Sequence, residues 1–118
     1  MHKKYTWHKI ASSIEELDFG VNKLAGVEVV GKHICLARFD GQLKACAAKC
    51  PHASGVLSEG FLDGMGNITC PVHRYKFNLD NGRNVSGEGY HLKTYPVEVR
   101  EDGVYIGFQE GGLMSWLR

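Results

Sequence analysis

Two short stretches, Cys50-Pro-His52 and Cys70-Pro-Val-His73, decide how this chain is built and what it holds. Each offers one thiol and one imidazole, and seventeen residues separate His52 from Cys70. Thiolate and imidazole ligands suit zinc or iron, whereas calcium and magnesium prefer oxygen ligands. Either stretch alone is a weak signal, but together they predict one metal centre with Cys50, His52, Cys70 and His73 as ligands.

The order of the ligands separates zinc from iron. Zinc fingers place a Cys pair before a His pair, whereas each stretch here supplies one Cys and one His. Two irons bridged by sulfides suit that division if each loop reaches across the cluster. A proline follows each Cys, at Pro51 and Pro71, and stiffens the loop. The pattern favours an iron–sulfur centre and leaves a zinc-bound interaction module as the alternative.

Length and charge narrow the class of protein. A chain of 118 residues predicts a single domain, 1–118, with no second core. The formal net charge of +1 gives no reason to expect binding to nucleic acid or to a membrane surface. No apolar run is long enough to cross a bilayer, and no apolar segment follows the lysines near the start. A cytoplasmic protein is therefore expected, with its cysteines reduced or bound to metal.

Short apolar runs between turn residues predict an all-β fold of roughly nine or ten strands in small antiparallel sheets. The expected strands lie in residues 5–11, 27–30, 34–39, 43–48, 67–69, 75–79, 91–100 and 105–108. The Asp40-Gly41 pair is the strongest hairpin signal, and Gly31-Lys32 is expected to make the turn before it. Pro96 should confine part of its strand to a sheet edge.

Other segments are expected to be irregular. Residues 12–17 predict a short helix, with a serine cap and Glu15 or Glu16 completing a capping box. Residues 53–66 contain four glycines and no sustained period, and they predict a loop. The two metal-binding loops, about 48–58 and 68–78, each follow a predicted strand and can meet at one tip.

With these motifs the chain, from about residue 27 to 108, resembles the Rieske ferredoxin family, to which the small subunit of assimilatory nitrite reductase is related. The resemblance implies a Rieske-like fold of three antiparallel sheets with both cluster-binding loops at one tip. It implies one [2Fe-2S] cluster, with Cys50 and Cys70 on the buried iron and His52 and His73 on the outer iron.

The sequence departs from the family pattern at three places. Tyr75 stands where high-potential relatives have Ser and ferredoxins often have Gly, and we expect it to pack in the core or to approach a ligand. Ser54 replaces a glycine after His52. Residues 85–90, which should form the third loop beside the cluster, contain no proline. Neither ligand loop carries the extra Cys of high-potential relatives, so a potential in the lower half of the family range is expected.

Cys35 and Cys46 lie symmetrically about the Asp40-Gly41 turn and should be directly opposite each other. Counting outward from the turn makes them a hydrogen-bonded pair, in which the Cβ atoms are too far apart for an easy disulfide. We expect two free core thiols.

The function expected from this sequence is one-electron transfer, because no catalytic triad, phosphate loop or dinucleotide motif accompanies the centre. The chain would shuttle electrons between a reductase and a terminal oxygenase or other redox enzyme, docking through the cluster tip. Residues 51–57 carry no charge, and Arg74 and Lys76 border the second loop. A nitrite-reductase-like small subunit and an iron or redox sensor are the alternatives.

Overall fold

The computed structural model of the protein describes residues 4–51, 55–72, 74–87 and 89–110. Within these ranges the chain forms ten strands and two 3-10 turns, with no α-helix, which confirms the predicted all-β fold. The strands are β1 (Tyr5–Ala11), β2 (Leu24–Val29), β3 (Lys32–Phe39), β4 (Gln42–Ala47), β5 (Phe61–Leu62), β6 (Asn67–Thr69), β7 (Lys76–Asn78), β8 (Thr94–Tyr95), β9 (Val97–Arg100) and β10 (Gly103–Gln109). No helix in the described part of the chain is long and apolar enough to cross a membrane.

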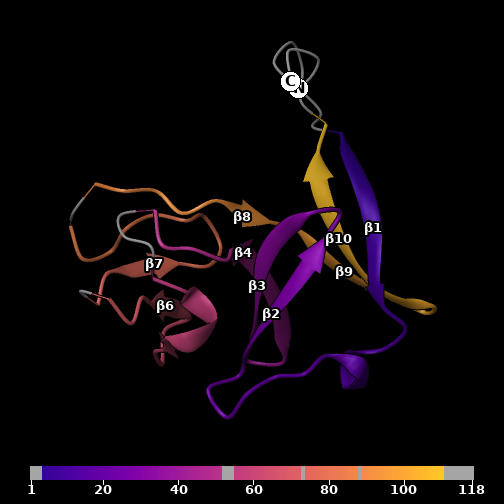
Figure 1. The fold of residues 1–118 in the computed structure, drawn as a ribbon, viewed down its shortest axis with the longest axis horizontal. Helices are drawn as coiled ribbons and strands as arrows, with labels where there is room; N and C mark the ends of the chain where they lie inside the picture. The colour runs from indigo at the N-terminus through magenta and orange to yellow at the C-terminus, as the bar shows by residue number, and fades with distance from the viewer. Residues whose placement is uncertain (1–3, 52–54, 73, 88, 111–118) are drawn as a thin grey trace.

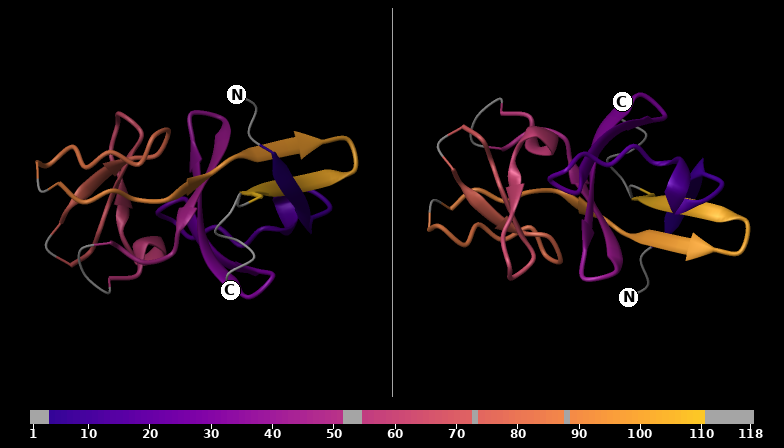
Figure 2. Two further views of the ribbon diagram at one scale, coloured as in Figure 1. Left: turned by 90° about the horizontal axis from the view of Figure 1, so that it is seen from above. Right: turned by 90° about the horizontal axis from the view of Figure 1, so that it is seen from below.

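The strands form three antiparallel sheets, in the orders β1-β10-β9, β2-β3-β4-β8 and β5-β6-β7. The sheets follow one another along the molecule, as Figures 1 and 2 show, with β5-β6-β7 at one end and β1-β10-β9 at the other. The four-stranded sheet lies between them. The three antiparallel sheets that the family resemblance implied are therefore present.

Two tight hairpins set the register of the central sheet. Phe39 pairs with Gln42 across Asp40-Gly41, as predicted, and both turn residues have positive φ (52° and 73°). The preceding turn is one residue earlier than expected, since Val29 pairs with Lys32 across Val30-Gly31. A two-residue turn of this kind needs positive φ at both central positions, and Gly31 takes the second. Val30 therefore adopts a conformation that is rare for a β-branched residue.

Pro96 divides the strand predicted at residues 91–100. Thr94–Tyr95 pairs with β4 in the central sheet, whereas Val97–Arg100 pairs with β10 in the terminal sheet. Proline has no N–H to continue the first ladder, so the chain leaves one sheet and enters the other at this residue. Both halves are edge strands, as predicted.

Two segments differ from expectation. The helix predicted at 12–17 is a single 3-10 turn, Ile14–Glu16, and Ser13 makes no side-chain cap. The predicted capping box is not formed, because Glu16 Oε1 accepts from the N–H of Ser12, the residue before the N-cap, at 2.7 Å. The segment predicted as a loop at 53–66 contains a 3-10 turn, Leu57–Glu59, and the short strand β5. Pairing with β6 creates that strand, which no periodicity in its own sequence could indicate.

Candidate metal centre

Three loops meet at the end of the molecule formed by the β5-β6-β7 sheet. The first follows β4 and begins at Cys50, the second joins β6 to β7 through Cys70, and the third is residues 84–90. Figures 1 and 2 place the described parts of all three loops at this end. The predicted ligands His52 and His73, and also Ser54, lie outside the described residues.

The two cysteines predicted as ligands are brought together in one buried core. Cys50 is 5% exposed and Cys70 is fully buried, and both belong to a cluster that includes Leu57 and Phe77. Burial raises the pKa of the Cys70 thiol, and the neighbouring Cys50 thiol raises it further. A hydrogen bond from the Val72 N–H opposes this rise. Two thiols held side by side away from water become thiolates most readily when they bind a metal cation.

Backbone hydrogen bonds shape each cysteine loop. The Cys50 N–H donates to the carbonyl of Gly55 at 3.0 Å, and the Cys70 N–H donates to the carbonyl of Tyr75 at 2.8 Å. Each bond closes a short loop that begins at its cysteine. The Val72 N–H points at Cys70 Sγ, 3.4 Å away, which is a contact that stabilises negative charge on the sulfur.

Gly55 leaves the space that Cys70 occupies. A methyl group at this position would lie 2.6 Å from Cys70 Sγ and 3.0 Å from Val72 Cγ2. The sulfur of the second loop therefore rests against the backbone of the first loop. Two buried sulfurs, an N–H aimed at one of them and a side-chain-free residue beside it fit a cluster that is held by cysteine on its inner side.

The structure settles two other expectations about nearby residues. Tyr75 packs against the buried core, and its ring stacks on Tyr90 with the centroids 6.1 Å apart. Cys35 pairs directly with Cys46, and both are fully buried free thiols, as predicted. Gly55 carried no prediction of its own, although its position three residues after the predicted ligand His52 was a usable signal. No local pattern in the sequence indicated the Tyr75–Tyr90 stack.

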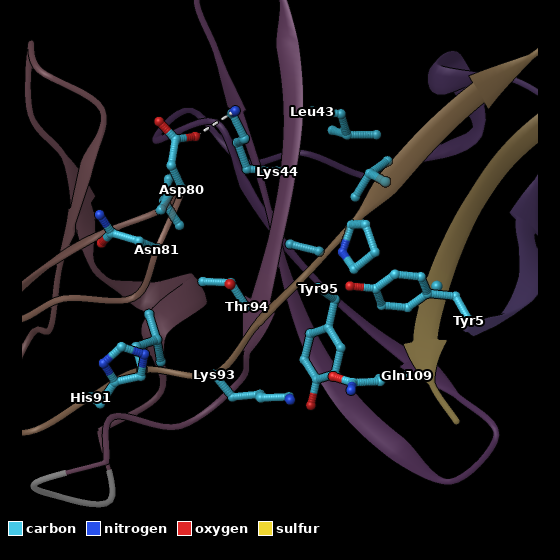
Figure 3. A pocket seen from close by; sticks show the side chains of 16 residues that line it. Tyr5, Leu43, Lys44, Asp80, Asn81, His91, Lys93, Thr94, Tyr95 and Gln109 are labelled. Carbon is cyan, nitrogen blue, oxygen red and sulfur yellow. Dashed lines mark hydrogen bonds and ion pairs between the residues drawn. The ribbon is translucent and has the colours of Figure 1, made fainter. Parts of the chain in front are cut away.

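A groove on the side of the molecule is separate from this centre. The groove has a volume of about 620 Å³ and lies beside β4 and β8. Figure 3 shows its lining side chains, including the Lys44–Asp80 ion pair. Tyr5 and Gln109 line it from the terminal sheet. Neither cysteine ligand lines the groove, so we assign it no part in metal binding.

Comparison with known proteins identifies a family whose members carry an iron–sulfur cluster, which the two buried cysteines also suit. The family model described as "Rieske [2Fe-2S] domain" matches residues 6–96. The ferredoxin component of the naphthalene 1,2-dioxygenase system of Pseudomonas aeruginosa is 35% identical over 82 residues, which are 69% of this chain and 78% of that protein.

Solved structures share the fold. A complex of reduced oxygenase and oxidised ferredoxin in carbazole 1,9a-dioxygenase contains a chain that is 32% identical, with a TM-score of 0.70, covering 84% of this chain and 99% of that one. A Mycobacterium tuberculosis protein described as an NADH-dependent nitrite reductase small subunit gives a TM-score of 0.76 at 22% identity, covering 89% and 96%. At that identity the second likeness shows the fold alone.

Proposed function

The chain belongs to the Rieske [2Fe-2S] domain family, and from that premise we propose that it carries one electron at a time between a reductase and a terminal oxygenase. The buried pair Cys50 and Cys70 carries this proposal. The names of its relatives support the oxygenase as acceptor, because they are ferredoxin components of dioxygenase systems. We place the protein in the cytoplasm, where its buried free thiols at Cys35 and Cys46 would stay reduced.

Cys50 and Cys70 would hold one iron, and His52 and His73 would hold the other. When bound, the cluster supplies reversible one-electron chemistry. The protein's part is to keep water from the sulfurs through burial and to direct the Val72 N–H at Cys70 Sγ. Both features tune the potential without any residue entering a chemical step.

The surface around the second loop suits a brief protein contact. Pro51 and Pro71 are exposed, and Val72 is 39% exposed beside the buried Cys70. Arg74 is exposed and forms no ion pair with any of the described residues. Lys76 Nζ lies 3.9 Å from Asp63 Oδ2, which is a long and therefore weak ion pair. An apolar centre with a cationic rim favours fast, salt-sensitive docking to an acidic partner surface.

The iron content of the purified protein tests the cluster. We expect two irons and two sulfides per chain, a red-brown colour and a reduced-state EPR signal with an average g below 2. Replacing Cys70 with Ser should abolish the signal. A colourless protein that contains stoichiometric zinc would instead establish the zinc-module alternative and refute the proposal.

Electron transfer to an oxygenase tests the docking surface. Arg74→Glu should slow the reduction of the oxygenase and weaken its dependence on salt, because a rim charge acts mainly on the association rate. Lys9→Glu is the matched control, since Lys9 is exposed on β1 in the distant sheet. Equal rates for the parent, the control and Arg74→Glu would exclude docking through this rim.

A further inference from the structure

We propose that Tyr75 and Tyr90 form an aromatic clamp that holds the third loop, residues 84–90, as a wall beside the iron–sulfur position and limits the access of water to its Cys70 side. The inference rests on the function proposed above. It concerns a loop that lacks the proline expected at this place, so another device must hold it.

The first end of the loop is anchored by backbone contacts to the strand that leaves Cys70. The Val85 N–H donates to the carbonyl of Lys76 at 2.9 Å. In return, the Lys76 N–H donates to Ser86 Oγ at 3.1 Å. A further bridge joins Asn84 to Phe77, next along the same strand. The beginning of the loop is therefore part of the β7 edge.

Two of the described residues near the middle of the loop are glycines. Gly87 and Gly89 both have positive φ, 94° and 86°. A Cβ atom at either position would meet nothing within 4 Å. Glycine is the residue with the greatest backbone freedom, and these two make no side-chain contact. A contact at the far end of the loop would therefore restrict backbone motion that these two glycines leave free.

Tyr90 supplies that anchor. Its ring is stacked on Tyr75 at a centroid distance of 6.1 Å and an interplanar angle of 29°. Tyr75 packs on the core that contains Cys50 and Cys70, and its carbonyl accepts the Cys70 N–H at 2.8 Å. The stack thus joins the end of the third loop to the residue that closes the Cys70 loop. Tyr90 remains 43% exposed although it stacks on Tyr75, so the pair lies at the boundary between the core and solvent.

The clamp has a definite electrochemical consequence. Solvent exposure is one of the factors that set the potential of such a centre. Reduction adds one negative charge, and water stabilises that charge better than a protein interior does. Opening the wall should therefore raise the midpoint potential. Opening the wall should also speed the loss of the cluster to a chelator by roughly two- to tenfold. This is the factor by which the loss of one aromatic pair would favour the open form of the loop.

Three variants of the cluster-loaded protein test the clamp. Tyr90→Ala removes the stack, and Tyr90→Phe keeps the ring but not the hydroxyl. Tyr105→Ala is the matched control, because that ring lies 4.1 Å from the Arg100 guanidinium in the distant terminal sheet. We expect a higher midpoint potential and faster cluster loss for Tyr90→Ala only. In the iron-free protein, the Cys70 amide should exchange hydrogen faster in that variant alone.

The outcomes separate this proposal from the function on which it rests. A parent protein that binds no iron would refute the electron-carrier proposal, and the amide exchange would still decide the clamp. The clamp would be refuted, and the carrier left intact, if the loaded parent matches loaded Tyr90→Ala in potential and cluster loss and the two iron-free proteins match in Cys70 amide exchange. A Tyr90→Phe variant that behaves like Tyr90→Ala would show that the hydroxyl, and not the stacked ring, holds the loop.

Discussion

Replacing Gly55 with Ala should damage the centre by sterics alone. Gly55 is not among the glycines with positive φ, so an alanine there would not be forced into the left-handed backbone region. Its methyl carbon would nevertheless lie 2.6 Å from Cys70 Sγ. That distance is about 1 Å shorter than an ordinary non-bonded contact. Either the sulfur or the first loop must move.

The size of the effect follows from the cost of overpacking, which is about 1–3 kcal/mol in a well-packed core. A loss of about 2 kcal/mol corresponds to roughly thirtyfold weaker retention of the cluster. In the iron-free protein, the same cost would lower the Tm by roughly 6–12 °C for a chain of this length. The loss of retention should exceed the loss of stability, because bound iron prevents Cys70 Sγ from moving aside.

Gly64→Ala is the matched control, since a Cβ atom there would meet nothing within 4 Å. Iron content, visible absorbance and calorimetric Tm should be measured for the parent and both variants. Gly64→Ala should stay within about 0.5 kcal/mol of the parent. If Gly55→Ala keeps both the iron content and the Tm of the parent, the inference that the two loops are too closely packed for a methyl group is wrong.

Three further predictions concern potential and pH. The midpoint potential should lie in the lower half of the family range of about −150 to +300 mV, and a value above about +200 mV would contradict this reasoning. If His52 and His73 hold the outer iron, the midpoint should fall as pH rises in the alkaline range, because the higher charge of oxidised iron would disfavour the imidazole protons. A flat profile from redox titration would exclude this coupling. The pKa of the Cys46 thiol is raised by its hydrogen bond with Cys35, by burial and by charge on Cys35. As pH rises, this thiol therefore ionises in the unfolded protein before it ionises in the folded protein. The free energy of unfolding should decline above about pH 8.5 for this reason. Denaturant titrations of the parent and Cys46→Ala check this, and an equal decline in both would rule Cys46 out as its source.

The predictions from sequence were best where a local signal has one structural solution. The Asp40-Gly41 turn determines the β3-β4 register, and that register places Cys35 opposite Cys46. They were weaker where pairing between distant segments decides the outcome. β5 exists because Phe61 pairs with Thr69, and the single strand expected around Pro96 belongs to two sheets.

The sequence by itself determined the chemistry of the centre, because thiol and imidazole groups at this spacing suit few metals. Only the tertiary structure decided how the loops fit together. It placed Gly55 against Cys70 Sγ and Tyr90 on Tyr75, and both contacts join separate segments of the chain. The physical reason is that ligand identity is a property of side chains, whereas close packing depends on backbones that the sheets bring together from separate parts of the chain.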